Sequence, residues 1–138
     1  DKQVNLGGLL RTERPSLWTM QLFDTWITDF KASDDIVDLY VFNYAKKEHT
    51  TMLTNLLLMN YRYDTINPSL AIIYDLSHRD TILVPALDLV FGDHWRVHME
   101  ADLFLTDGGN GAGGVNSAHL LGTLENNDQF YARITYQF

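Results

Sequence analysis

The clearest candidates for chemistry lie in one short segment where ionisable residues occupy every second position. His94, Arg96, His98, Glu100 and Asp102 alternate there with mainly apolar residues. His98 and Glu100 match the H-x-E of zinc deaminases, but that motif needs a partner motif with two cysteines, and the chain has none. In a strand, His94 and His98 would lie about 13 Å apart, too far to share a metal ion. His98 and Glu100, about 6.6 Å apart, could share one only with a ligand from a neighbouring strand. The segment therefore predicts a row of polar side chains rather than a metal site.

Two other patterns are too weak to predict a cofactor or a catalytic centre. The run 109–114 satisfies G-x-G-x-x-G, but the rest of the chain is short and ends in an alternating strand, so the βαβ unit of a dinucleotide site is absent. Ser117 and His119 share the same glycine-rich stretch, but no nucleophile-elbow motif accompanies them. We therefore predict no cofactor and no enzymatic activity, with an outer-membrane barrel hydrolase as the alternative.

The composition narrows the class of protein further. The chain has 138 residues, with 10 Lys plus Arg against 18 Asp plus Glu and a net charge of -8, which argues against nucleic acid as a partner. The absence of cysteine removes disulfides, thiol catalysis and thiolate metal sites. The length suits one domain, residues 1–138, and no window is apolar enough to predict a transmembrane helix. Because the chain starts at Asp1 without Met, we expect a mature form or a portion of a longer protein.

Hydrophobic residues recur at every second position through most of the chain, which predicts an all-β fold. Asp24 interrupts the apolar parity of the first candidate strand, which predicts a β-bulge there. The candidate strands cover residues 17–30, 36–43, 51–63, 67–77, 82–91, 94–105 and 129–138, and the segment 4–10 would add an eighth.

The apolar faces of these strands can point into a protein core or out into lipid, and three features favour lipid. Several strands have ten or more residues, longer than in most soluble sheets but suited to a bilayer crossed at a tilt of about 40°. Trp18 and Trp26 would lie about 26 Å apart along a strand, which places them, with Trp95, in interfacial aromatic girdles. Tight turns alternate with longer loops, as in outer-membrane barrels. The residues then predicted to line the lumen are Asp75, Asp88, Arg96, His98, Glu100, Asp102, Tyr131 and Arg133.

The segment 129–138 resembles the closing strand of Gram-negative outer-membrane β-barrels, which characteristically end in Phe. In those proteins, aromatic and apolar residues at steps of two before the terminal aromatic form the signal that the barrel-assembly machinery reads. The resemblance implies the same role here for Phe130, Ala132, Ile134, Tyr136 and Phe138. The segments 9–18, 58–63 and 91–96 look like the C-terminal part of a family of large outer-membrane barrels of uncharacterised function. That resemblance implies a fragment of a longer barrel, linked to uptake or export of hydrophobic compounds, often beside inner-membrane pumps.

We therefore expect an antiparallel transmembrane up-and-down β-barrel of seven or eight strands, or the C-terminal section of a larger barrel, in a Gram-negative outer membrane. Its expected function is the passage of small molecules, of hydrophobic or amphipathic character because Ile73, Val84 and Val90 share the lumen parity. Two alternatives are a small eight-stranded structural barrel without a pore and a soluble lipocalin-like ligand-binding barrel.

The expected partners are outer-membrane lipid and lipopolysaccharide, the barrel-assembly machinery, and periplasmic or inner-membrane transport proteins. With Phe138 at the periplasmic end, the turns at 31–34, 64–68 and 92–93 would be periplasmic. The segments 44–50, 77–80 and 106–127 would then face outward.

Overall fold

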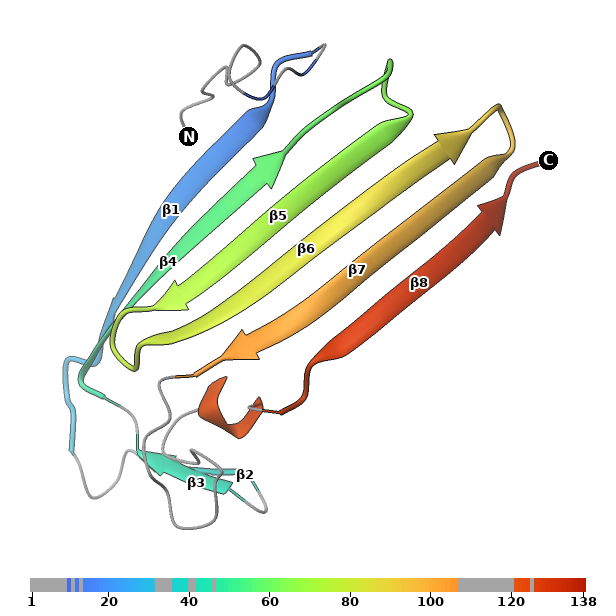
Figure 1. The fold of residues 1–138 in the computed structure, drawn as a ribbon. Coiled ribbons are helices and arrows are strands. Elements are labelled where there is room, and N and C mark those ends of the chain that lie inside the picture. Colours follow the sequence, from blue (N-terminus) through green and yellow to red (C-terminus); the bar gives the residue numbers. More distant parts are fainter. Residues whose placement is uncertain are drawn as a thin grey trace.

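The fold is a single antiparallel β-sheet with a separate small hairpin (Figure 1). A computed structural model describes residues 10, 12, 14–31, 36–39, 42–45, 47–106, 121–124 and 126–138. The six-stranded sheet has the order β1-β4-β5-β6-β7-β8, so the predicted all-β, up-and-down arrangement is confirmed. In the described part of the chain, β1 and β8 are the two edges of the sheet and do not pair with each other. The strands of the sheet are β1 (Leu17–Trp26), β4 (His49–Leu58), β5 (Ile66–Asp75), β6 (Asp80–Phe91), β7 (Trp95–Leu105) and β8 (Gln129–Tyr136).

The prediction that the segment 36–43 is a strand of the main sheet is wrong. This part of the chain forms a hairpin of its own, β2 (Ile36–Leu39) with β3 (Phe42–Ala45), while β1 pairs directly with β4. Alternating residues suit a local hairpin as well as a long strand, so the pattern alone could not separate them. Among the described residues, the main sheet therefore has six strands. The segment 4–10, expected as an eighth strand, lies outside the described residues except for Leu10.

The connection from β1 to β4 leaves and returns at the end of the sheet opposite Phe138 (Figure 1). The backbone N–H of Ile27 donates to the carbonyl of Glu48 at 2.9 Å and ties the two ends of this connection together. The prediction that the turn at 31–34 lies at the Phe138 end is therefore wrong, because it assumed a strand at 36–43. Residues 32–34 themselves lie outside the described part.

The bulge predicted at Asp24 is also wrong. The register between β1 and β4 is unbroken from the pair Leu17–Leu58 to the pair Trp26–His49. Asp24 stays on the apolar side because Thr51 Oγ1 donates to its Oδ1 at 2.8 Å and His49 Nε2 lies 2.7 Å from the same oxygen. Polar partners on the adjacent strand thus accommodate the carboxylate without an extra residue.

The register places residues of like character on the same face of all six strands, as the sequence predicts. We call one side the apolar face and the other the polar face. The apolar face includes Trp18, Leu57, Leu70, Leu87, Met99 and Ala132, and the polar face includes Asp88, His98, Glu100, Tyr131 and Arg133.

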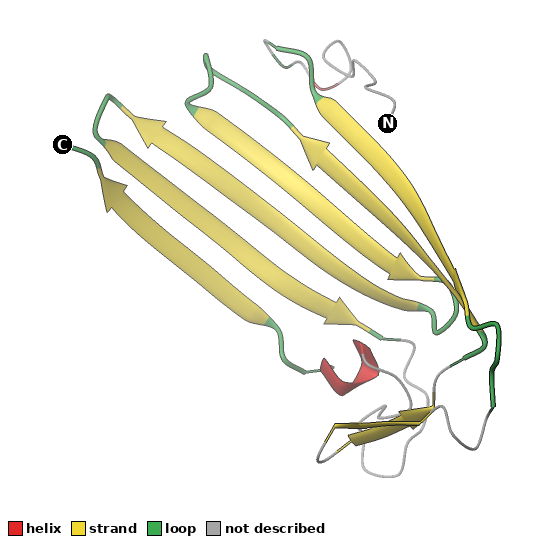
Figure 2. Ribbon diagram, turned by 180° about the vertical axis from the view of Figure 1, so that it is seen from behind, coloured by secondary structure: helices red, strands yellow, loops and turns green. Residues whose placement is uncertain are grey.

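The described residues of the sheet form no buried hydrophobic core. Figures 1 and 2 show one layer of strands seen from its two sides. Among the described residues no hydrophobic side chain is buried, and only Ser16, Asp75 and Asp80 are. On the edge strand β8, Phe130 and Ile134 are 70% and 69% exposed. A single layer cannot bury its own faces, so this sheet needs a covering that its described residues do not supply.

Successive strands are displaced along one another. A row of paired residues perpendicular to the strands runs through Leu17, Leu58, Ser69, Ala86, Glu100 and Tyr131. Leu17 begins β1, whereas Tyr131 lies well before Tyr136, which ends β8 at the same side of the sheet. The displacement along the strands is about 17 Å over a sheet width of about 24 Å. The strands are therefore inclined by roughly 35° to the perpendicular of the line that joins their ends. The value falls in the range of strand tilt found in closed barrels.

The two ends of the sheet differ in their connections. At the Phe138 end, β4–β5 and β6–β7 are joined by short turns, the second of which uses Gly92 at a φ of 58°. At the opposite end lie the short β5–β6 turn at residues 76–79, the hairpin β2–β3, and the connection from β7 to β8, whose described residues include the 3-10 turn Leu121–Leu124. No helix in the described ranges has the length and apolar character required to cross a bilayer.

Candidate functional site

The predicted lumen residues gather on the polar face over β6, β7 and β8. Asp88 on β6 is directly opposite His98 on β7, and His98 is opposite Arg133 on β8. Glu100, next on the same face of β7, is opposite Tyr131. The structure therefore brings five of the predicted residues into one continuous group.

His98 is the centre of this group. Its Nδ1 lies 2.7 Å from Asp88 Oδ1, and its Nε2 lies 3.5 Å from Glu100 Oε2. The Tyr131 ring packs beside the imidazole, with 5.9 Å between ring centroids. The His98 side chain is only 20% exposed because these neighbours surround it. A carboxylate therefore lies beside each ring nitrogen of His98, and the group forms a continuous polar patch.

The other predicted residues on these strands extend the polar row in both directions. Arg96 Nε donates to Gln137 Oε1 at 3.3 Å, toward the Phe138 end. Gln129 Nε2 donates to Asp102 Oδ2 at 2.8 Å, toward the opposite end. Arg133 makes no ion pair within the part of the chain that the structure describes. The positive charges thus lie nearer the Phe138 end, and Glu100 and Asp102 lie nearer the other end.

Asp75 shares the polar face but lies apart from the other predicted residues, at the end of β5. Its Oδ1 accepts hydrogen bonds from the backbone N–H groups of Ser77 and His78, at 2.8 and 3.2 Å, and its Oδ2 lies 2.7 Å from His78 Nδ1. The Asp75 side chain is nearly buried and stabilises the β5–β6 turn. The local sequence Asp-x-Ser-His indicates this role in a turn, because an Asp two residues before a backbone donor is typical of an Asx turn.

The polar face over β1, β4 and β5 is more apolar than the part over β7 and β8. Leu56 on β4 is opposite Ala71, which is opposite Val84 on β6, and Ile73 is opposite Ile82. The polar face therefore consists of a charged half, over β7 and β8 with Asp88 at its border, and an apolar half. Sequence reasoning identified Ile73 and Val84 but not their grouping, which depends on the strand order.

The residues predicted as an assembly signal and as aromatic girdles all lie on the apolar face. Trp95 and Tyr136 are opposite each other with ring centroids 4.8 Å apart, and Tyr136 and Phe138 are 5.0 Å apart, both edge-to-face. Trp18 and Trp95 lie near the Phe138 end of the sheet, and Trp26 lies near the other end. Phe130, Ala132, Ile134 and Tyr136 follow one another along the apolar face of β8.

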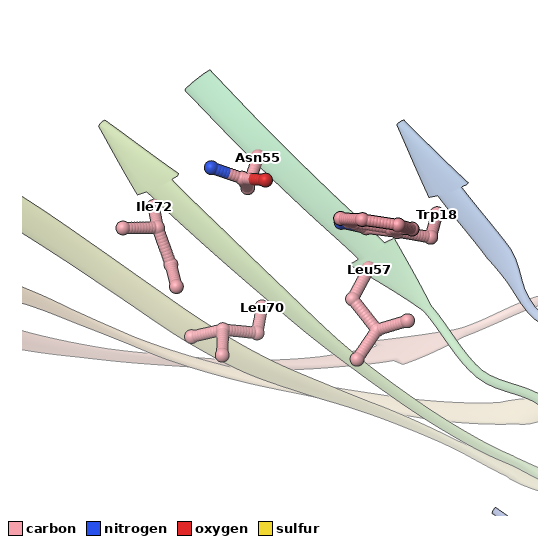
Figure 3. Close-up of a pocket in the computed structure, with 5 residues that line it drawn as sticks. All are labelled: Trp18, Asn55, Leu57, Leu70 and Ile72. Atoms are coloured by element: carbon pink, nitrogen blue, oxygen red, sulfur yellow. The ribbon is translucent and has the colours of Figure 1, made fainter. Parts of the chain in front are cut away.

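A shallow depression lies on the apolar face over β1, β4 and β5 (Figure 3). It has a volume of about 280 Å³ and is lined by Trp18, Asn55, Leu57, Leu70 and Ile72. Figure 3 shows the Asn55 amide among apolar side chains. Asn55 makes no hydrogen bond within the described residues, so a neutral polar group stands alone in the middle of an apolar surface.

No family model matches the sequence, and neither the comparison with curated proteins nor that with solved structures found a match. Among the described residues, no three His, Asp or Glu side chains are grouped closely enough to hold a metal ion.

Proposed function

We propose that the chain forms part of a transmembrane β-barrel in a Gram-negative outer membrane and that its polar face lines a passage for small hydrophobic or amphipathic molecules. One observation carries the proposal: no hydrophobic side chain is buried among the described residues, although one face of the sheet is apolar along most of its length. A bilayer would cover that face, and the polar face would meet water inside the barrel.

The size of the hydrophobic effect supports an apolar covering. Burying one large apolar side chain is worth about 1.5–3 kcal/mol, whereas a whole domain is stable by only about 5–15 kcal/mol. Leaving the whole apolar face in water would therefore cost more free energy than the net stability of a typical domain. The large side chains exposed on this face are Trp18, Met20, Leu22, Trp26, Phe91, Trp95, Leu105, Phe130, Ile134, Tyr136 and Phe138.

The lengths of five of the six strands fit a bilayer. β1, β4 and β5 have 10 residues each, β7 has 11 and β6 has 12, while β8 has 8. A transmembrane strand tilted at about 45° needs about 9–11 residues, and the stagger of this sheet gives a similar inclination. Strands of soluble sheets are usually about five or six residues long.

The proposed orientation rests on the place of Phe138. The Phe138 end, with the β4–β5 and β6–β7 connections, would lie on the periplasmic side, where the assembly machinery would read the column from Phe130 to Phe138 and where periplasmic or inner-membrane transport partners would dock. The opposite end would meet lipopolysaccharide in the outer leaflet. Trp26 lies there with its Nε1 donating to Glu48 Oε1 at 3.3 Å, a pairing suited to an interface that is apolar on one side and wet on the other.

The two open edges favour a section of a larger barrel. β1 and β8 would each need another strand, because an exposed strand edge leaves backbone N–H and C=O groups unpaired in lipid. A passage built on this sheet would have one charged wall and one apolar wall. That division favours a cargo with both polar and apolar parts.

Cysteine labelling of two adjacent residues tests which face meets lipid. Because the chain has no cysteine, Val97→Cys and His98→Cys each introduce a single thiol, on opposite faces of β7. In protein reconstituted into lipid vesicles, we expect a water-soluble maleimide to modify position 98 and to spare position 97 until the protein is unfolded. Equal labelling at both positions, or a protein that does not float with the vesicles, would contradict the proposal.

Planar-bilayer recording separates a passage from a structural barrel. An open passage predicts stepwise conductance from the purified protein, whereas a barrel filled by its own side chains would insert without conducting. A protein that stays in buffer without detergent would instead support the soluble ligand-binding alternative.

A further inference from the structure

The pairing between β6 and β7 is interrupted in the middle of the sheet. Paired residues run from Thr81–Leu105 to Leu83–Leu103 and resume at Ala86–Glu100. The gap leaves Val84 and Pro85 on β6 facing Ala101 and Asp102 on β7 without ladder pairing. β6 is an internal strand, and proline is normally confined to edge strands, strand ends and bulges.

The position of the gap identifies the missing hydrogen bond. Proline has no N–H, and an N–H at residue 85 directed to the Ala101 carbonyl would complete both absent pairs, Val84–Asp102 and Pro85–Ala101. The Ala101 carbonyl therefore has no donor from β6. Pro68, the proline of the neighbouring strand, shows the usual placement: it lies just beyond the β4–β5 pair Leu58–Ser69, and its carbonyl accepts from Met59 N at 3.0 Å.

A shallow hollow of about 310 Å³ lies at this gap. Pro85 and Ala101 are both small, so no long side chain covers the backbone between them. Leu87, Met99 and Phe130 of the apolar face surround the hollow, and Glu100 also lines it. The result is an apolar depression next to a carbonyl oxygen that lacks a partner from the sheet.

From this arrangement we propose a ligand site: the hollow binds a small apolar molecule that carries one hydroxyl, with the hydroxyl donating to the Ala101 carbonyl. The apolar walls select a hydrophobic body, and the unpaired acceptor selects a donor rather than an acceptor group. A lone carbonyl on an apolar surface is costly to leave unpaired, which gives the hydroxyl its advantage over a hydrocarbon of the same size. The site does not depend on transport, because it exists whether lipid or protein covers the apolar face.

Binding of a matched pair of probes to the folded protein in detergent micelles tests the site. We expect 1-naphthol to bind about tenfold more tightly than 1-methoxynaphthalene, which has no donor, as one hydrogen bond in an apolar site would give. Pro85→Ala supplies the missing N–H, so the two probes should bind that variant with about equal affinity. Pro68→Ala is the control and should keep the preference.

Hydrogen exchange verifies that the variant acts by the stated route. The amide that Pro85→Ala introduces should be protected from exchange, because it would bond to the Ala101 carbonyl. The proposal is overturned if wild-type protein does not prefer naphthol, if Pro85→Ala keeps the preference, or if the new amide exchanges freely. Displacement of naphthol by added phospholipid at equal molar ratio would also overturn it, in favour of a lipid site. None of these outcomes depends on the labelling or conductance experiments that test the proposed function.

Discussion

The two faces of the sheet share one backbone and one register but hold their side chains together in different ways. On the polar face, Asp88, His98 and Glu100 are linked by short polar contacts, and Asn67 is hydrogen-bonded to Asn60 at 2.9 Å. On the apolar face, aromatic rings such as Trp95 and Tyr136 contact each other edge to face, and Asn55 has no hydrogen bond within the described residues. These polar-face groups thus pair with one another, whereas the apolar face depends on whatever covers it. The same substitution should therefore have opposite consequences on the two faces.

The largest expected effect is on assembly of the apolar column of β8. Deletion of Phe138, or Phe138→Ser, removes the aromatic that packs against Tyr136 at 5.0 Å and that ends the proposed assembly signal. We expect most of the protein to fail to reach the outer membrane, measured as the heat-modifiable folded fraction in purified membranes. Gln137→Ser, one residue earlier, is the control and should assemble normally. Equal assembly of both variants would contradict the proposed role of Phe138 in the assembly signal.

Placing a charge on each face gives the next largest effect. Met99→Arg puts a guanidinium on the apolar face close to the middle of β7 and should reduce the free energy of unfolding in lipid by about 2–4 kcal/mol, as expected near the bilayer midplane. Tyr131→Arg puts the same group on the polar face opposite Glu100 and should change it far less. Reversible urea unfolding in lipid vesicles measures both values. A similar loss in the two variants would mean that the apolar face does not meet lipid.

Two asparagine replacements should have opposite signs. Asn55→Leu removes an unpaired amide from the apolar face and should stabilise the protein by about 1–2 kcal/mol. Asn67→Leu removes an amide that accepts from Asn60 and donates to the Asp64 carbonyl at 2.8 Å, and should destabilise by about 1–3 kcal/mol. The same unfolding measurement applies to both. Destabilisation by Asn55→Leu would show that the amide has a partner in the assembled protein.

The smallest effect is expected in the charged group around His98. Asp88 is about half exposed, and exposed ion pairs contribute about 0.2–1 kcal/mol. Asp88→Asn should therefore lower stability by less than about 1 kcal/mol. Conductance should be a more sensitive readout, since a charge lining a narrow passage alters ion selectivity. A selectivity identical to that of wild type, in a protein that conducts, would place Asp88 outside the passage.

The side-chain parity of each strand could be predicted from the sequence, because a period of two needs only local information. That is why Phe130, Val97 and Trp18 are all on one face, as expected. The hairpin at 36–45 could not be predicted, since its pattern fits pairing with either a distant strand or its own neighbour. The unbroken strand at Asp24 was missed for a related reason: the groups that accommodate its carboxylate, Thr51 and His49, come from a strand whose register was unknown.

The candidate site, like the fold, could be predicted from the sequence only in part. The row on β7 was evident from alternation alone, but the contact of His98 with Asp88 depends on the register of β6 against β7. Asp75 was grouped with the lumen residues by parity, whereas its place at a turn gives it a separate structural role. The gap at Pro85 was visible in the sequence only as an unusual residue, and the strand order shows that it interrupts an internal ladder.

The direction of the two edge strands has a consequence for the proposed closed barrel. β1 runs away from the Phe138 end and β8 runs toward it (Figure 1). If every neighbour in a closed ring is to be antiparallel, only an even number of further strands can be inserted between them. An odd number would create one parallel junction, which requires a long crossover instead of a tight turn. Any further strands in such a ring must therefore be even in number, whether they come from the same chain or from another.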